Sequence, residues 1–245
     1  MLTDSQDAYG HLVWDYLKKG VGQEIVERDD GLLDPSDTLP AYYFAEFRNW
    51  AARERKAMRF VRGKVLDVGC GAGRAALYLQ EQGFDVLGID LSPLAVKVCK
   101  LRGVMKVQLL SATGVDVNLG KFDTILMFGN NFGLLNSFRR GRHLLRKFHQ
   151  ITSDSARIIA ESVDPYKTTD PAHLAYQRRN RSKGRMSGQV RIRIRYRTYA
   201  TPWFDYLLVS KSEMTRLITG TGWSIERFIN SAGPAYMAII RKTRT

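Results

Sequence analysis

Cysteine is scarce in this sequence, since its 245 residues contain only Cys70 and Cys99. Two thiols cannot build a disulfide framework or a four-thiolate zinc site. The four histidines lack the spacing of metal ligands, so we expect no metal. The chain has no apolar run of about 18 residues, and its acidic start lacks the basic and apolar parts of a signal peptide. These absences predict a cytoplasmic protein with no membrane partner.

Proline and glycine are also limited, at 7 and 21 residues, whereas 44% of the chain is hydrophobic. This composition excludes collagen-like, low-complexity and wholly disordered chains. The length suits one large domain, or one domain with an elaboration, and is ample for a buried core.

Positive charge is abundant but concentrated. The net charge is +14, of which residues 139–147 carry +5 and residues 166–200 carry +9. The first 40 residues carry −6. The basic excess therefore belongs to two local segments, and each needs its own explanation.

The N-terminal region has the pattern of a helical cap. Apolar residues at helical spacing predict a helix over 6–19, and a second, aromatic-rich helix is predicted over 42–60. Between them, residues 22–40 contain strong turn chemistry around Asp34-Pro35-Ser36-Asp37 and are expected to form a loop.

From residue 64 onwards, short β-branched runs alternate with helical stretches. Strands that are apolar on both faces indicate a parallel sheet covered by helices on both sides. Right-handed crossovers make this a doubly wound α/β fold with a mostly parallel, seven-stranded sheet. The last two strands, 222–231 and 235–242, are separated by the turn signal Gly233-Pro234.

The alternation stops after residue 164 and resumes with the last helix, which predicts a β-rich insertion. Residues 165–188 have no clear periodicity, whereas 190–199 alternate with a period of two. The predicted organisation is a helical cap at 1–62, a core at 63–164, a basic insertion on the substrate side at 165–205, and a return to the core at 206–245.

The segment from Val65 to Arg74 carries the chemistry, because a buried strand runs into Gly69, Gly71 and Gly73 and then directly into a helix. Glycines let the backbone turn sharply and let a ligand approach it closely. The helix N-terminus offers free N–H donors.

Two acidic residues near the glycine-rich segment indicate which ligand it binds. Asp67, two residues before the first glycine, would repel a diphosphate but suits an ammonium group. Asp90 ends the second strand, where a carboxylate can accept from two ribose hydroxyls. Ser92 and Pro93 can start the following helix, which leaves Asp90 for a ligand. An ammonium together with a ribose diol describes S-adenosylmethionine.

Over about 64–163 and 210–241 the sequence resembles the class I S-adenosylmethionine-dependent methyltransferases. VLDVGCGAGR resembles the family's glycine-rich motif and VLGIDLS its second-strand acid motif, and the last two strands resemble its closing antiparallel pair. The resemblance implies a methyltransferase that releases S-adenosylhomocysteine. The cofactor-binding residues that it implies are Asp67, Gly69, Cys70, Gly71, Gly73, Asp90, Leu91, Ser111, Ala112, Thr113, Phe128 and Gly129.

In this resemblance the glycines would face the methionine half of the cofactor and Leu91 the adenine. Ser111-Ala112-Thr113 stands where the family often has an acid for the adenine amino group, so the chain departs from the family there.

No catalytic residue can be assigned, because transfer from a sulfonium depends mainly on alignment. The motif for exocyclic base amines is absent after the fourth strand, and neither cysteine is placed as a nucleophile for cytosine carbon-5. The acceptor is predicted to be a small, anionic or amine-bearing molecule. The candidate substrate residues are Asn130, Asn131, Tyr43, Arg48 and Arg195.

Three alternatives remain open. Arg191, Arg193, Arg195 and Arg197 share one face of the predicted strand, so an RNA methyltransferase could use residues 190–199 to hold phosphates. A solvated strand face explains the same pattern. The others are a non-catalytic module that binds S-adenosylmethionine and an NAD-binding oxidoreductase, the latter disfavoured by Asp67 and Arg74. The oligomeric state has no sequence signal.

Overall fold

The computed structural model describes residues 2–36 and 38–243. The chain divides into two compact units, each of which is built from several segments. Unit 1 comprises Met1–Trp50, Leu66–Gly114 and Arg191–Phe204, and unit 2 comprises Ala51–Val65, Val115–Val190 and Asp205–Thr245.

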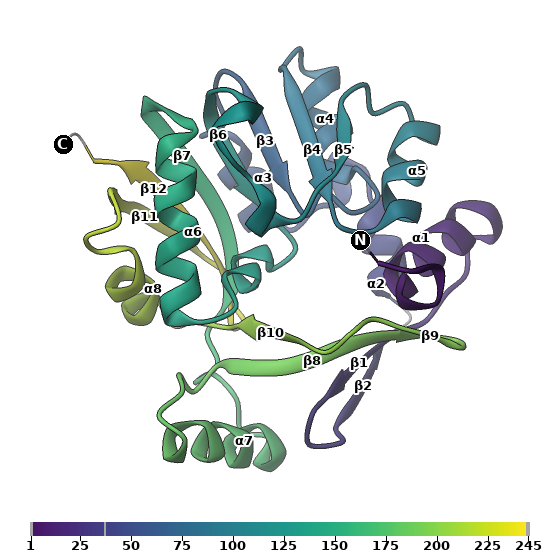
Figure 1. The fold of residues 1–245 in the computed structure, drawn as a ribbon, viewed down its shortest axis with the longest axis vertical. Coiled ribbons are helices and arrows are strands. Elements are labelled where there is room, and N and C mark those ends of the chain that lie inside the picture. The colour runs from purple at the N-terminus through teal and green to yellow at the C-terminus, as the bar shows by residue number, and fades with distance from the viewer. Residues whose placement is uncertain (1, 37, 244–245) are drawn as a thin grey trace. The chain divides into compact units, whose positions relative to one another are not determined.

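Unit 1 contains four longer helices and strands that follow the glycine-rich motif, together with most of the strand before it, the N-terminal elements and two strands from the insertion (Figure 1). Its elements are η1 (Asp4–Gln6), α1 (Ala8–Lys19), β1 (Glu24–Arg28), β2 (Leu33–Ser36), α2 (Leu39–Phe44), η2 (Phe47–Asn49), most of β3 (Val65–Val68), α4 (Arg74–Glu81), β4 (Val86–Asp90), α5 (Pro93–Leu101), β5 (Val107–Leu109), η3 (Ala112–Gly114), most of β8 (Gln189–Tyr196) and β9 (Tyr199–Ala200).

Unit 2 contains the later strands of the predicted core and the helices that follow them. Its elements are α3 (Ala52–Met58), η4 (Val117–Leu119), β6 (Phe122–Met127), η5 (Asn131–Leu135), α6 (Phe138–Gln150), β7 (Thr152–Val163), α7 (Pro171–Ser182), most of β10 (Phe204–Leu207), α8 (Lys211–Ile218), β11 (Trp223–Asn230) and β12 (Ala235–Lys242).

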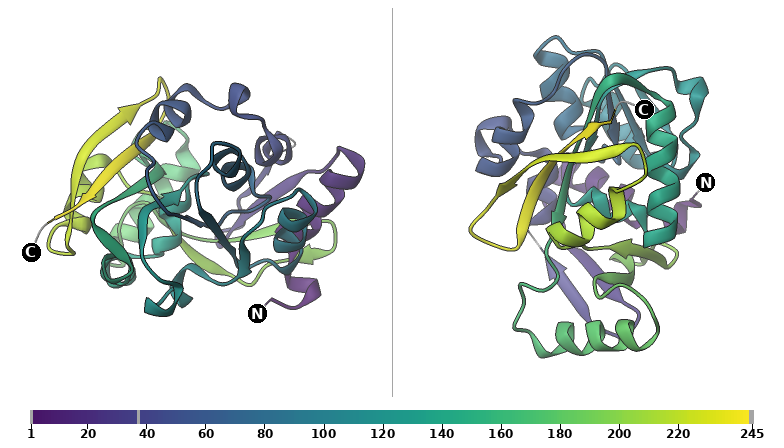
Figure 2. Two further views of the ribbon diagram at one scale, coloured as in Figure 1. Left: turned by 90° about the horizontal axis from the view of Figure 1, so that it is seen from above. Right: turned by 90° about the vertical axis from the view of Figure 1, so that its left-hand side faces the viewer.

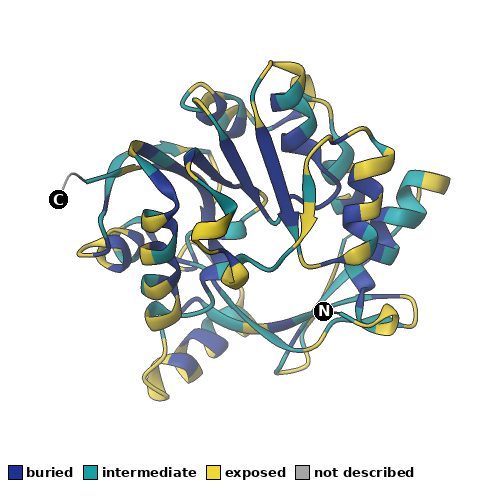
Figure 3. Ribbon diagram, turned by 45° about the horizontal axis from the view of Figure 1, so that its top comes forward, coloured by how far each residue is buried: buried dark blue, intermediate teal, exposed yellow. Residues whose placement is uncertain are grey.

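The seven-stranded sheet has the order β11-β12-β7-β6-β3-β4-β5, which confirms the predicted α/β fold. Strand β4 pairs with β5, and β6 with β7, in parallel. The last two strands are antiparallel to each other, as predicted, and β12 is antiparallel to β7. They run side by side as the yellow ribbon in both views of Figure 2. Strand β3 is buried along its whole length, because both of its faces are covered (Figure 3).

In unit 1, helix α1 packs against α5. Asp7 caps α1 by accepting a hydrogen bond from the Gly10 N–H, and its other oxygen accepts one from the Leu94 N–H at 3.0 Å. Val13 lies in one buried cluster with Ala72 from the glycine-rich loop and with residues of α5. The N-terminal helix is therefore part of the same core as the loop.

Helix α6 in unit 2 contains the basic segment 139–147, and it packs against α8. Its buried side chains lie at helical spacing, whereas its arginines lie outside this buried face. Arg142 donates to the Leu217 and Thr219 carbonyls at the C-terminal end of α8. The basic segment 139–147 is thus the polar face of an amphipathic helix.

The predicted loop over 22–40 is wrong. Residues 24–28 and 33–36 form an antiparallel hairpin, β1–β2, and β1 also pairs with β8, with Glu27 opposite Arg193. The second sheet has the order β10-β8-β1-β2, with β9 paired to β8. A strand whose main pairing partner lies far away in the sequence leaves little local signal, and the turn residues around Pro35 conceal it further.

Two helix predictions also need correction. The helix predicted over 42–60 is broken into α2, η2 and α3. Conversely, α7 occupies part of the segment that has no apolar periodicity. It starts where Asp170 caps the helix ahead of Pro171, and its buried residues include the polar Gln177 and Asn180, which bond to backbone carbonyls. A hydrophobicity pattern cannot detect a face of this kind.

Among the described residues, no helix combines the length and apolar character needed to cross a membrane.

Candidate functional site

The glycine-rich loop joins β3 to α4 in unit 1, with all three glycines in the left-handed region. Their φ values are 71°, 57° and 82° for Gly69, Gly71 and Gly73. The N–H groups of Gly69 and Cys70 donate to the Ile89 carbonyl, which ties the loop to β4. A side chain on Gly71 would collide with the Tyr9 hydroxyl, and one on Gly73 would meet Val104 and Cys99. Sterics therefore require glycine here.

Asp67 is a buried carboxylate with an unused oxygen. Its side chain lies on β3 with 2% of the residue exposed, and its Oδ2 is buried without a hydrogen-bond partner. Burial raises the pKa of Asp67 to about 7, against the opposing effect of the Arg74 guanidinium, and the Asp90 charge raises it further. Burying a carboxylate without a partner costs free energy of hydration, so this side chain is suited to bind a cationic group of a ligand.

Asp90, at the end of β4, holds the loop from the other side. Its Oδ2 accepts a hydrogen bond from the Gly71 N–H at 2.8 Å, and its Oδ1 accepts one from the Ser92 N–H at 2.9 Å. Ser92 caps α5 through the Ala95 N–H, and Pro93 occupies the first turn, as predicted. Asp90 is thus free of the capping role, and each of its oxygens retains a lone pair for a ribose hydroxyl.

Replacement of Asp90 by alanine should weaken S-adenosylmethionine binding by about 1–3 kcal/mol, the usual contribution of hydrogen bonds to a charged group. Calorimetric titration measures this change directly. Glu81→Ala, on α4, is the matched control and should bind as the wild type does. An unchanged affinity in the Asp90 variant would contradict its assignment to the ribose.

Arg74 links the loop to the aromatic residues of the cap. Its guanidinium lies 3.9 Å from the Tyr42 ring centroid and 4.2 Å from that of Trp50, and it donates to the Tyr42 hydroxyl at 2.7 Å. Phe47 stacks on Tyr78 of α4 at 4.0 Å. The aromatic residues of α2 and η2 therefore cover the start of α4, and Arg74 anchors them by cation–π contacts.

Both cysteines, Cys70 within the glycine-rich loop and Cys99 on α5, are buried free thiols. The Cys99 thiol donates to the Gly71 carbonyl at 3.1 Å, and the two sulfur atoms are 3.9 Å apart. The hydrogen bond with the Cys99 thiol raises the pKa of Cys70, and burial raises it further, so the thiol remains protonated. A packing role fits both side chains better than nucleophilic catalysis does.

The remaining predicted cofactor residues of unit 1 follow β4 and β5. Leu91 exposes 44% of its surface directly after Asp90, as an apolar contact for an adenine would require. The Ser111 hydroxyl accepts from the Gly114 N–H and lies 3.1 Å from the Thr113 hydroxyl, so it shapes the turn that contains Ala112.

In unit 2, the loop after β6 contains the other predicted residues. Phe128 is buried, and Gly129 and Asn130 both have left-handed φ values, of 64° and 65°. Glu161 on β7 accepts from both of their N–H groups, at 2.9 and 3.3 Å, and also binds Arg53 at 2.7 Å. The Asn130 Oδ1 is buried without a partner, and Asn131 begins η5. This loop is clamped while leaving one acceptor oxygen unused.

The Tyr206 hydroxyl completes this clamp by donating to the Asn130 carbonyl at 2.6 Å. Tyr206→Phe should therefore lower the free energy of unfolding by about 1 kcal/mol, the usual net contribution of one hydrogen bond. Tyr166→Phe, which removes an exposed bond to Glu213, is the control and should cost less than half as much in urea denaturation. The reverse order of the two losses would contradict the clamp.

The predicted substrate residues outside this loop have different surroundings. Tyr43 on α2 is partly buried and donates to Glu24. Arg48 has 78% of its side chain exposed and pairs with Glu46. Arg195 and Arg193 both bind Glu27 on the neighbouring strand β1. The alternation predicted for this strand is observed, with Ile192 and Tyr196 buried, but these two arginines have a carboxylate partner within the protein.

Sequence reasoning missed several residues of the site. The sequence patterns use Arg74 only as an argument against NAD, and they do not single out Tyr9, Glu24 or Glu161 as functional residues. The aromatic character of the cap was a signal for the partners of Arg74. Glu161 gave no local signal, because its partner Arg53 lies 108 residues away.

S-adenosylmethionine fits the geometry of unit 1. The unused Oδ2 of Asp67 matches its ammonium, the open left-handed loop admits close approach to the backbone, and Asp90 retains acceptor capacity for the ribose. Among the described residues, no group of three or more His, Cys, Asp or Glu side chains could hold a metal ion.

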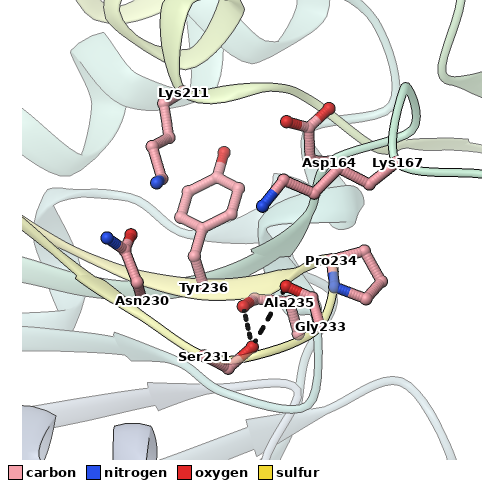
Figure 4. Close-up of a pocket in the computed structure, with 9 residues that line it drawn as sticks. All are labelled: Asp164, Lys167, Lys211, Asn230, Ser231, Gly233, Pro234, Ala235 and Tyr236. Carbon is pink, nitrogen blue, oxygen red and sulfur yellow. Dashed lines mark hydrogen bonds between the residues drawn. The ribbon is translucent and has the colours of Figure 1, made fainter.

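A separate shallow hollow lies in unit 2 beside the turn between β11 and β12 (Figure 4). Lys167 and Lys211 project towards it, and Ser231 hydrogen-bonds within the turn to the carbonyls of Gly233 and Ala235. None of the residues predicted to bind cofactor or substrate lines this hollow.

Comparison with known proteins adds a family assignment for the central segment. Residues 65–154 match the family described as "Methyltransferase domain". The chain is 39% identical over 75 residues to a 2-heptyl-1-hydroxyquinolin-4(1H)-one methyltransferase of Mycobacteroides abscessus, which covers 27% of this chain and 32% of that protein. It is 29% identical over 103 residues to a glycine/sarcosine N-methyltransferase of Parasynechococcus marenigrum, covering 40% and 36%. The match thus spans about a third of these curated relatives.

The likeness to one solved structure extends over the whole chain. A SAM-dependent methyltransferase from Bacteroides fragilis, solved in complex with S-adenosyl-L-homocysteine, has a TM-score of 0.84 and 26% identity, covering 100% of this chain and 98% of that one. This similarity includes the segments outside residues 65–154.

Proposed function

We propose that this chain is a class I S-adenosylmethionine-dependent methyltransferase and transfers the methyl group of S-adenosylmethionine to a small-molecule acceptor. The family match over residues 65–154 and the likeness to a solved methyltransferase support this proposal. The observation that carries this proposal is Asp67, whose buried, unpartnered Oδ2 lies at the start of the glycine-rich loop. The relatives named above support a small molecule as acceptor, and no observation favours RNA, since Arg193 and Arg195 already share Glu27.

The residues of unit 1 would hold the cofactor by three kinds of contact. Asp67 would bind its ammonium, the backbone around Gly71 would lie against its methionine half, and Asp90 would accept from its ribose hydroxyls. Leu91 would pack on the adenine, and Ser111 to Thr113 would border it. The aromatic residues anchored by Arg74 would exclude water from this region.

When bound, the cofactor supplies a methyl group on a positively charged sulfur, which the lone pair of an acceptor displaces in line. Alignment of the acceptor with the methyl group and the sulfur can lower the activation barrier by roughly 7–11 kcal/mol. We therefore assign the protein a positioning role in this displacement, which by itself requires no catalytic side chain. In unit 2, the unused Oδ1 of Asn130 is suited to accept a hydrogen bond from an acceptor molecule. Arg48 and Arg195 remain predicted substrate contacts.

Calorimetric titration of the stripped protein with S-adenosylmethionine, S-adenosylhomocysteine and NAD tests the proposal. We expect the two adenosyl ligands to bind and NAD not to bind, because a diphosphate would face the charge of Asp67. Binding of NAD alone would overturn the proposal. We place the enzyme in the cytoplasm, where its two buried thiols would stay reduced.

A further inference from the structure

Glu24, on β1 in unit 1, is a buried acid that nothing so far explains. Only 4% of the residue is exposed, and its Oε2 accepts a hydrogen bond from the Tyr43 hydroxyl at 2.6 Å. Among residues 2–36 and 38–243, the structure gives it no basic partner. Burial raises the pKa of Glu24, and the Tyr43 hydroxyl opposes this effect. Glutamate is almost never buried without a partner, because the loss of hydration costs several kcal/mol.

Glu27 on the same strand shows what a structural acid looks like here. It binds Arg193 at 2.7 Å and Arg195 at 3.1 Å, and these arginines hold its pKa below the ordinary value. The two acids are three residues apart, so strand β1 carries one glutamate that is paired with arginines and one whose partner is only a hydroxyl. No basic residue of the described chain pairs with Glu24, so a cation that binds it would have to come from a ligand.

A pair of tyrosines connects Glu24 with the glycine-rich loop. The Tyr43 ring lies edge-on to Tyr9, with the ring centroids 5.1 Å apart, and the Tyr9 hydroxyl lies against Gly71. Burial raises the pKa of Tyr9, and the charges of Asp90 and Glu24 raise it further, which places its hydroxyl within their influence. Tyr9 and Tyr43 each keep part of their surface exposed. The arrangement is thus a buried acid beside two partly buried tyrosines, next to the loop proposed to bind the cofactor.

We propose that Glu24, Tyr9 and Tyr43 bind the amino group of the methyl acceptor, so that the acceptor is an amine. A carboxylate and the faces of aromatic rings are the groups that recognise an ammonium ion. This inference rests on the proposed methyltransferase function and narrows its substrate class.

The same carboxylate would take the proton that must leave the amine. An ammonium gives one proton to Glu24, and the freed lone pair forms the new nitrogen–carbon bond. The carbon–sulfur bond breaks with its electron pair on sulfur, so the positive charge passes from sulfur to the methylated nitrogen. Glu24 then returns its proton to water. Burial of Glu24 favours its neutral, protonated form and so assists this transfer.

The test compares binding of matched small probes to protein saturated with S-adenosylhomocysteine. Butylamine and benzylamine represent the ammonium, and butyrate and benzoate are anions of similar size; binding is measured by ligand-observed NMR titration. We expect the wild type to bind each amine at least tenfold more tightly than its matched acid. Glu24→Gln should lose at least tenfold in amine affinity, whereas Glu27→Gln should retain it.

Stronger binding of the acids, no binding of the amines, or unchanged amine affinity in Glu24→Gln would each overturn the inference. The comparison of probes on the wild type decides the matter even if Glu24→Gln does not fold. The affinity of each variant for S-adenosylhomocysteine is measured first. Its absence in the wild type would contradict the proposed function itself, whereas normal cofactor binding without amine binding would contradict the amine site alone.

Discussion

Replacing Asp67 by asparagine should weaken S-adenosylmethionine binding at least hundredfold at pH 7.5. The variant keeps the size of the side chain but removes the charge that faces the ammonium, and truncating one member of a buried charge pair commonly costs 2–5 kcal/mol or more. A hundredfold loss corresponds to about 2.8 kcal/mol. Calorimetric titration of both proteins gives the difference, and Asp85→Asn, in an exposed pair with Lys106, is the control that should bind normally.

The pH dependence of S-adenosylmethionine binding provides a second, independent test of the role of Asp67. Burial raises the pKa of Asp67 to about 7 in the free protein, so the carboxylate takes up a proton as the pH falls below this value. Protonation removes the partner of the ammonium, and wild-type affinity should therefore decrease from pH 7.5 to pH 5.5. The ligand's own amino group, which loses its proton near pH 8, limits the affinity on the alkaline side. A wild-type affinity that rises as the pH falls would contradict the assignment.

Gly71→Ala should lower the free energy of unfolding by about 2–5 kcal/mol and abolish detectable cofactor binding. One part of the cost, about 1–2 kcal/mol, comes from an L-residue in the left-handed region, where Gly71 has a φ of 57°. The rest comes from collision of the new methyl group with the Tyr9 hydroxyl. Urea denaturation measures the loss of stability, and calorimetric titration with S-adenosylhomocysteine measures the loss of cofactor binding.

Two further variants separate strain from collision at Gly71. Gly83→Ala introduces the same methyl group at a φ of 83° with no atom within 4 Å, so it should show only the backbone cost. Removing the tyrosine side chain in Tyr9→Ala/Gly71→Ala should cancel the collision, and the two substitutions should be less harmful together than their separate effects predict. Strict additivity would show that Tyr9 does not press on the loop.

The proposed amine site and the predicted cofactor site depend on different levels of information. Asp67, the three glycines and Asp90 belong to two short segments in which a buried strand passes directly into a turn and a helix. Such signals are local, because left-handed turns and helix starts depend on neighbouring residues. Glu24 gives no such signal, since it stands in a segment whose turn residues predict a loop.

The sequence by itself therefore determined the alternation of strands and helices, the glycine-rich loop and the acids that select its ligand. Only the tertiary structure decided that β1 pairs with β8, that Glu27 receives Arg193 and Arg195 while Glu24 receives no cation, and that Glu161 joins Arg53 to the Asn130 loop. The side-chain contacts among them join residues between 31 and 168 positions apart. Burial and charge compensation depend on which distant segments meet in space, and the order of residues along one segment does not contain that information.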